Sequence, residues 1–245
     1  MRSETASSMS KDQIIVALDV PTAAEARDHI DRLRDEVGAF KIGLQLYTSE
    51  GPALIREVVA DGVKLFLDVK FHDIPVTVAK ASVEVARLGV WMFNLHALGG
   101  SEMMRRSVQS VREVCENENL RRPKIIGVTV LTSSNQKTLF ETGIEREVGT
   151  QVAELAKLCR ESGLDGVVAS PLETGNIRAS VDNREFLIVT PGVRTGSVEA
   201  DDQKRVMSPR DALHNGSNYL VIGRPILNAD DPVDAVREIV EQIEK

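Results

Sequence analysis

The sequence contains few cysteines, few aromatic residues and no long apolar run. Its 245 residues include 2 cysteines, Cys115 and Cys159, which lie far apart and outside any Cys-x-x-Cys pair, so we predict free thiols in a reducing cytoplasm. Aromatic residues make up 4% of a chain that is 42% hydrophobic, which favours an aliphatic α/β core over an aromatic-rich β-sandwich. No apolar run approaches the roughly 20 residues that a membrane helix needs, so we expect no membrane partner.

Basic residues are fewer than acidic residues, with 30 Lys and Arg against 37 Asp and Glu. The net charge is −7, which argues against nucleic acid as a partner, and an anionic small substrate would have to be held by local positive groups. Residues 1–10 are polar and serine-rich and lack the apolar segment of a signal peptide. We therefore expect a disordered tail over residues 1–10 and one catalytic domain over residues 11–245.

Short runs rich in β-branched residues alternate with longer amphipathic stretches from residue 13 onward. Strands are expected at residues 14–18, 39–42, 64–69, 91–95, 125–130, 166–169, 186–189 and 219–222. Helices are expected at residues 23–36, 52–61, 76–88, 101–117, 148–162, 172–179, 209–215 and 232–243. This alternation predicts a parallel sheet built from βαβ units. Eight units in this length indicate a single-domain (β/α)8 TIM barrel, although a doubly wound sheet has the same local pattern.

Nearly every predicted strand runs into a polar or reactive residue. In chain order these are Asp19, Lys41, Asp68 with Lys70, His96, Thr132, Ser170, Arg194 and Arg224. A barrel brings the carboxyl ends of all its strands to one mouth, whereas an open sheet would spread these residues along a crevice. The polar residues therefore favour the barrel.

A charged cluster ends the third predicted strand. Because side chains alternate along a strand, Asp68 and Lys70 share one face, and Lys41 on the second strand is their natural neighbour. Buried charges are costly unless paired, so we predict an alternating array of these three residues, with a purely structural ion pair as the alternative. Asp73 precedes Ile-Pro and is expected on a loop, where it would either serve the site or cap the next helix.

Two glycine–arginine motifs follow the seventh and eighth predicted strands. They read Thr190-Pro-Gly-Val-Arg194 and Val221-Ile-Gly-Arg-Pro225. These loops are the usual phosphate-binding position of such barrels. Gly192 and Gly223 allow close approach, Arg194 and Arg224 can chelate phosphate oxygens, and Gln203 could close over the same anion. The alternative is a pair of surface arginines beside turn glycines.

The cluster indicates acid chemistry without a metal or cofactor. A metal held by Asp19, Asp68 or a histidine would be repelled by Lys41 and Lys70. A Schiff-base lysine is disfavoured as well, because a lysine between carboxylates keeps its proton. We interpret His96 as a hydrogen-bonded wall residue.

Taken together, the motifs resemble the orotidine 5′-monophosphate decarboxylases of the bacterial type over residues 13–243. The resemblance rests on Ile15-Val-Ala-Leu-Asp19, Phe40-Lys-Ile-Gly43, Phe66-Leu-Asp-Val-Lys-Phe-His-Asp-Ile-Pro75, Val128-Thr-Val-Leu-Thr132, Leu164-Asp-Gly-Val-Val168, Thr190-Pro-Gly-Val-Arg194 and Val221-Ile-Gly-Arg-Pro225. The Asp-x-Lys-x-x-Asp core is highly specific when all these flanking motifs occur in order.

The resemblance implies a cofactor-free decarboxylation of orotidine 5′-monophosphate to UMP, the last step of de novo pyrimidine nucleotide synthesis, with Lys70 as proton donor to C6. It also implies a homodimer in which Asp73 and Thr77 are shared across the interface. The remaining implied roles are the ribose hydroxyls for Asp19 and Thr77, the pyrimidine edge for Thr132, and the 5′-phosphate for Arg194, Gln203, Gly223 and Arg224.

One position departs from the family pattern. The family usually has asparagine after Asp-Ile-Pro, whereas this chain has Val76, which cannot supply the hydrogen bonds of an amide. Two rival functions remain open on sequence grounds. One is a sugar-phosphate decarboxylase or aldolase working through a metal-bound enediolate, and the other is a catalytically silent nucleotide-binding protein.

Overall fold

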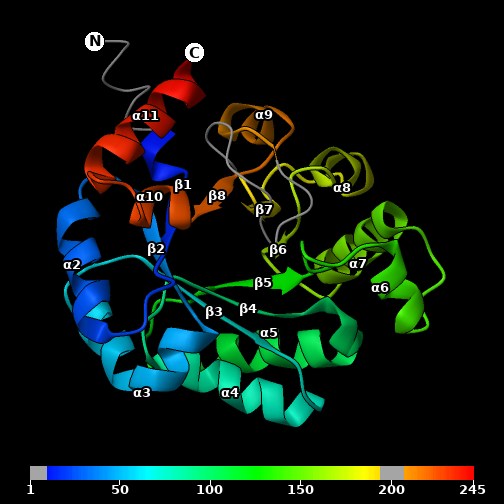
Figure 1. The fold of residues 1–245 in the computed structure, drawn as a ribbon. Helices are drawn as coiled ribbons and strands as arrows, with labels where there is room; N and C mark the ends of the chain where they lie inside the picture. Colours follow the sequence, from blue (N-terminus) through cyan, green and yellow to red (C-terminus); the bar gives the residue numbers. More distant parts are fainter. Residues whose placement is uncertain (1–9, 194–206) are drawn as a thin grey trace.

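The protein is a closed parallel β-barrel surrounded by helices (Figure 1). The computed structural model describes residues 10–193 and 207–245. Each strand pairs with the next in chain order, and β8 pairs with β1 to close the ring. The strands are β1 (Ile14–Ala17), β2 (Ala39–Gly43), β3 (Leu65–Phe71), β4 (Met92–His96), β5 (Lys124–Val128), β6 (Gly166–Val168), β7 (Leu187–Pro191) and β8 (Tyr219–Ile222). The predicted TIM barrel is confirmed.

Helices connect the strands and form the outer ring. They are α2 (Ala23–Leu33), α3 (Leu44–Ala60), α4 (Pro75–Arg87), α5 (Gly100–Asn117), α6 (Gln136–Glu141), α7 (Val148–Glu161), α8 (Thr174–Ser180), α9 (Pro209–His214), α10 (Arg224–Leu227) and α11 (Pro232–Glu244), with the short 3-10 helix η1 at Ala97–Gly99. Side-chain caps start several of them, among them Thr22 at α2 and Asp231 at α11.

The predicted helix at residues 52–61 corresponds to the second of two helical segments that make up α3, and the first segment was not predicted. In the structure α3 begins at Leu44 and continues through a kink at Gly51, where φ is 67°, before Pro52. Glycine tolerates this left-handed backbone, and proline fits the first turn of the second helical segment, which therefore starts directly after the break. The short helices α6 and α10 were also absent from the prediction.

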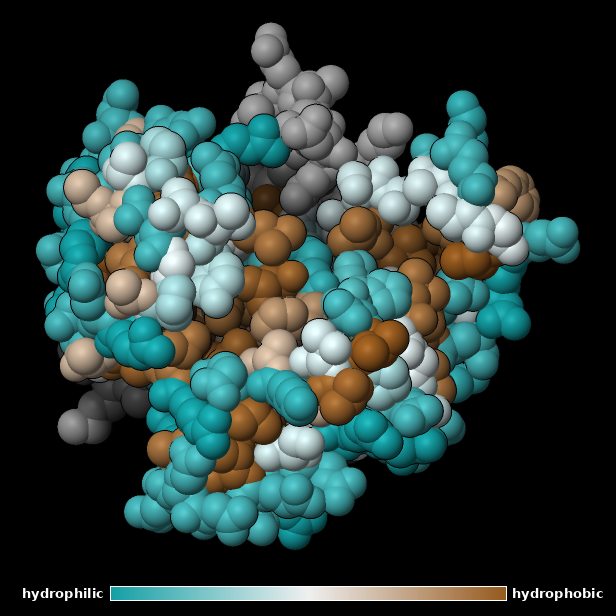
Figure 2. All heavy atoms as spheres, turned by 90° about the horizontal axis from the view of Figure 1, so that it is seen from below, coloured by the Kyte–Doolittle hydropathy of each residue, from teal (hydrophilic) through white to brown (hydrophobic). Residues whose placement is uncertain are grey.

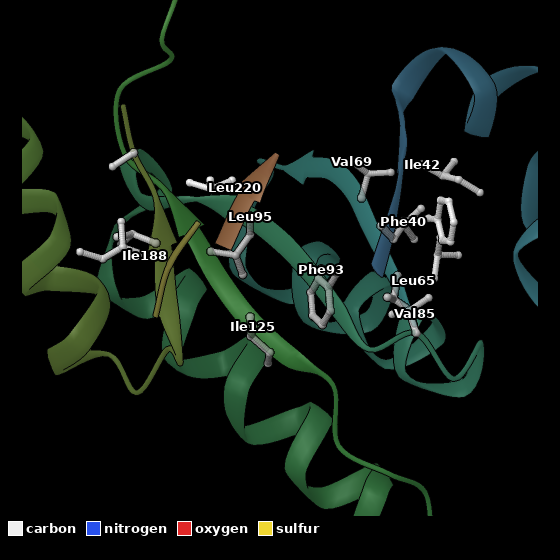
Figure 3. Packing of buried hydrophobic residues seen from close by; sticks show 14 of the residues in the cluster. Phe40, Ile42, Leu65, Val69, Val85, Phe93, Leu95, Ile125, Ile188 and Leu220 are labelled. Carbon is white, nitrogen blue, oxygen red and sulfur yellow. The ribbon is translucent and has the colours of Figure 1, made fainter. Parts of the chain in front are cut away.

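Two hydrophobic clusters hold the barrel together. The larger lies between strands and helices, and Figure 3 shows part of it, with Phe40 on β2, Leu65 on β3 and Val85 on α4. The smaller cluster faces the barrel interior and comprises Ile15, Ala17, Ala39, Phe66, Met92, Ile126, Val189 and Val221. Because inward positions recur every two residues, the next inward positions on β2, β3 and β4 carry Lys41, Asp68 and Asn94. The polar residues therefore lie directly above the smaller hydrophobic cluster, which fills the barrel interior and is called the apolar plug below.

Close packing at β6 depends on a glycine. A side-chain carbon at Gly166 would lie 2.2 Å from the backbone oxygen of Leu187 on β7, so only glycine fits at this crossing. Among the described residues, no helix combines the length and the apolar character needed to cross a membrane.

Candidate active site

Four charged side chains from three neighbouring strands meet at the barrel mouth. Asp68 lies between two lysines, with its Oδ2 3.3 Å from Lys41 Nζ and its Oδ1 2.7 Å from Lys70 Nζ. Lys41 Nζ also lies 3.3 Å from Oδ1 of Asp19, which follows β1. Lys41 and Asp68 are buried, whereas the Lys70 side chain is 27% exposed and reaches toward solvent. The alternating order predicted from the sequence is present, extended by Asp19.

The two lysines keep the Asp68 carboxyl group ionised. Burial by itself would raise the pKa of Asp68, but the charges of Lys41 and Lys70 and hydrogen bonds from Lys70 and Asn94 outweigh it and hold that pKa below its usual value. Within the described ranges, no three or more His, Cys, Asp or Glu side chains are grouped in a way that could hold a metal ion. In this cluster, ammonium groups occupy the positions beside the carboxylates.

An irregularity in β3 brings Asp68 and Lys70 together. Leu67 pairs with Phe93 and Phe71 pairs with Leu95, so three residues of β3 stand opposite one residue of β4. This bulge contains Lys70, whose φ is 52°. A left-handed conformation costs a residue other than glycine roughly 1–2 kcal/mol, so it requires support from its surroundings.

The residue of β4 opposite this bulge is Asn94, which the sequence analysis missed. Its side chain is fully buried and makes two hydrogen bonds. Oδ1 accepts from the backbone N–H of Lys70 at 2.8 Å, and Nδ2 donates to Asp68 Oδ1 at 2.7 Å. A signal was present in the sequence, because Asn94 is a polar residue inside an otherwise apolar strand, two positions before His96.

In the described part of the chain, Asp73 and Thr77 make no hydrogen bond or ion pair with this array. Asp73 is exposed on the loop between β3 and α4, and its Oδ1 accepts from the backbone N–H of Ile74 at 2.6 Å. The helix-cap alternative for Asp73 is wrong, since Ile74 occupies the N-cap position of α4 and makes no side-chain cap. Thr77 is exposed in the first turn of α4. In the part of the chain that the structure describes, no ion pair joins Asp73 to Lys41 or Lys70.

The loop after β8 meets the array at Asp19. A side-chain carbon at Gly223 would lie 3.5 Å from Asp19 Oδ2, and Arg224 follows as the first residue of α10. On the neighbouring loop, Gly192 follows β7 with a φ of 83°. Arg194 and Gln203 lie outside the described residues. Thr132 lies in the turn beyond β5 and is half-buried.

A pair of histidines lies next to the array. The rings of His72 and His96 have their centroids 5.4 Å apart. Burial lowers the pKa of His96, the nearby His72 and Lys70 lower it further, and Asp68 opposes them. His96 lies in the wall as predicted, but its Nδ1 is buried and has no hydrogen-bond partner among the residues described.

Comparison with known proteins places the chain in a family. Residues 12–239 match the Orotidine 5′-phosphate decarboxylase / HUMPS family. The chain is 52% identical to an orotidine 5′-phosphate decarboxylase of Trichlorobacter lovleyi, with 96% of each protein covered. It is also 52% identical to one of Moorella thermoacetica, covering 96% of this chain and 93% of that protein.

Solved structures agree with this similarity. The crystal structure of orotidine 5′-phosphate decarboxylase from Lactobacillus acidophilus superposes with a TM-score of 0.82 at 34% identity, covering 95% of this chain and 99% of that one. An uncharacterized conserved protein from Geobacillus kaustophilus superposes with a TM-score of 0.80 at 35% identity, over 94% and 99% of the two chains. The chain therefore belongs to the orotidine 5′-phosphate decarboxylase / HUMPS family.

Proposed function

We propose that this protein converts orotidine 5′-monophosphate to UMP and CO₂, the last step of de novo pyrimidine nucleotide synthesis, without a metal or cofactor. Relatives that are about half identical over nearly the whole chain carry the name of this decarboxylase. The observation that carries the proposal is the array in which Asp68 lies between Lys41 and Lys70. In this array the Asp68 carboxylate supplies a fixed negative charge, and the Lys70 ammonium, which is hydrogen-bonded to it, supplies a proton that can be transferred.

Asp68 and Lys70 have separate roles in the proposed reaction. Asp68 faces the substrate carboxylate, and repulsion between the two anions raises the energy of the bound ground state. When the bond from C6 to the carboxylate breaks, CO₂ leaves and the electron pair stays on C6. The Lys70 ammonium stabilises this developing charge and then transfers its proton to C6. Lys41 of the same chain and Asp73 of a second copy position the inner pair.

The rest of the nucleotide provides binding energy remote from the reacting bond. Gly223 and Arg224, together with Arg194 and Gln203 outside the described residues, hold the 5′-phosphate in this proposal. Asp19 and Thr77 hold the ribose hydroxyls and Thr132 the pyrimidine edge. Asp19 is well placed for this role, since it joins the Lys41 end of the array to the Gly223 loop. Remote binding energy of this kind organises a site for the chemical step.

We further propose that the active protein is a homodimer in which Asp73 and Thr77 reach the partner's site. Asp73 is exposed, and among the described residues it makes no ion pair with Lys41 or Lys70 of its own chain, which leaves its carboxylate available to a second copy. Exposed hydrophobic residues begin the nearby helices, with Leu44 at α3 and Ile74 and Val76 at α4. Figure 2 views the side on which α3, α4 and α5 lie, and hydrophobic residues gather in the middle of that face. A second copy covering this side would bury them.

The test is loss of orotate absorbance on mixing the protein with orotidine 5′-monophosphate. Lys70→Ala should reduce turnover by about 100-fold or more, the range for loss of general acid catalysis, while UMP still binds. Lys64→Ala is the matched control and should keep full activity, because Lys64 is exposed and directly precedes β3 at the end opposite Lys70. Excess EDTA should leave the rate unchanged. Retained turnover in Lys70→Ala, or a rate abolished by EDTA, would contradict the proposal.

A further inference from the structure

Asn94 connects the two residues to which the proposed reaction assigns the chemistry. Its Nδ2 lies 2.7 Å from Asp68 Oδ1 and its Oδ1 lies 2.8 Å from the backbone nitrogen of Lys70. The same Asp68 oxygen receives the Lys70 ammonium at 2.7 Å. The buried amide of Asn94 therefore completes a ring of hydrogen bonds that includes Asp68 Oδ1 and both the backbone and the side chain of Lys70.

The neighbours of position 94 require a side chain that both donates and accepts a hydrogen bond, as an amide does. A carboxylate only accepts hydrogen bonds and a backbone N–H only donates, so the residue between them must present one donor and one acceptor. Leucine would leave the backbone N–H of Lys70 without its acceptor and remove one hydrogen bond from Asp68, and aspartate would place a second acidic group against Asp68. Asn94 has no exposed surface, so water does not replace a lost partner as it would at the protein surface.

The two hydrogen bonds also explain the shape of the bulge. With three residues of β3 opposite one of β4, regular strand pairing leaves the Lys70 N–H without a β4 carbonyl partner. The Asn94 side chain supplies the acceptor instead, which holds Lys70 at a φ of 52°. In this conformation the Lys70 ammonium reaches the carboxylate two residues earlier in the same strand.

We propose that Asn94 is a positioning residue that fixes the reacting pair by holding the Asp68 carboxylate and the Lys70 backbone together. The inference rests on the proposed decarboxylation. Asn94 acts through its two neighbours and does not touch the substrate. Its substitution should therefore affect the chemical step and leave nucleotide binding largely intact, because the phosphate-binding residues lie on the loops after β7 and β8.

The test compares Asn94→Leu and Asn94→Asp, both close to asparagine in size. For each variant, kcat on orotidine 5′-monophosphate, the dissociation constant for UMP and the thermal midpoint are measured. We expect kcat to fall by about tenfold to a hundredfold, as for loss of hydrogen bonds to charged or constrained groups, with UMP affinity within about threefold. UMP binding also shows that each variant is folded, and Asn94→Asp serves if Asn94→Leu does not fold.

Asn218→Leu is the matched control. Asn218 also accepts from the backbone N–H of a neighbouring strand, at 2.7 Å from Ile188, but it precedes β8 at the opposite end of the barrel. Its loss should lower the thermal midpoint and leave kcat unchanged. Full kcat in both Asn94 variants, or a loss of kcat matched by loss of UMP binding, would overturn this inference alone. An inactive unsubstituted protein would overturn the proposed function and this inference together.

Discussion

At the scale of single residues, alternation and charge pairing predict most of the array. Lys41, Asp68 and Lys70 could be placed together because period-two geometry puts two of them on one face and buried charges need partners. Asn94 could not be assigned a role in this way. Its function depends on the bulge between Leu67 and Phe71, which exists only through the pairing of β3 with β4.

His96 makes the folding free energy depend on pH. Its folded pKa is lowered, first by burial and then by His72 and Lys70, so the unfolded chain, with an imidazole pKa of about 6.5, binds the proton more readily. The stability contribution is therefore complete above about pH 6.5 and is lost as the pH falls toward the folded pKa. The free energy of unfolding can be measured by urea titration at about pH 7.5 and at about pH 5.5. Between these two pH values it should fall by less in His96→Asn than in the unsubstituted protein. His214→Gln, at the exposed end of α9, should behave like the unsubstituted protein; an equal decrease in His96→Asn would contradict the assignment.

At the scale of elements, hydrophobic periodicity located every strand, and β8 has the predicted bounds of residues 219–222. The failures have local causes. Gly51 and Pro52 do mark a break between two helical segments, but the first segment, which begins at Leu44, was not predicted. The six residues of α6 are too few to show a period, and its start is set by the capping box at Asn135.

The close contact between β6 and β7 predicts that adding one methyl group at Gly166 destabilises the protein. Gly166→Ala forces a carbon against the backbone oxygen of Leu187, which cannot rotate away, so the strands must separate. We expect a loss of about 1–3 kcal/mol or more in the free energy of unfolding, measured by denaturant titration. Gly175→Ala in α8 is the matched control, because nothing lies within 4 Å of the added carbon, and alanine should stabilise the helix by up to about 1 kcal/mol. Equal stability of the two variants would contradict this account.

At the scale of the whole molecule, the barrel was predictable and the assembly was not. Polar residues after successive strands distinguished a closed ring from an open sheet, and closure by β8 on β1 agrees. No pattern in one chain reveals which exposed residues face a second copy. In the proposed dimer, the exposed side chains of Ile74 and Val76 would be covered together with the neighbouring Asp73.

Sharing of Asp73 can be tested by mixing two inactive variants. Lys70→Ala and Asp73→Ala homodimers should each lack activity, but a mixed dimer would carry one site with both residues intact. After subunit exchange at equal amounts, about a quarter of all sites should be active, since half of the dimers are mixed and each has one complete site. Activity is followed by loss of orotate absorbance, and each variant mixed with itself is the control. No recovery on mixing, although exchange is demonstrated by a tagged subunit, would show that Asp73 serves its own chain.

Closure of the barrel also bears on how the protein is made. β1 is synthesised before all the other strands of the barrel, whereas one of its two neighbours, β8, is synthesised after all of them. Until β8 arrives, β1 and β7 each expose an unpaired edge, and the apolar plug lacks Val221. The nascent chain therefore completes the barrel mouth only after β8 has been synthesised, and a chain terminated before β8 would be a substrate for chaperones or proteases rather than a weaker enzyme.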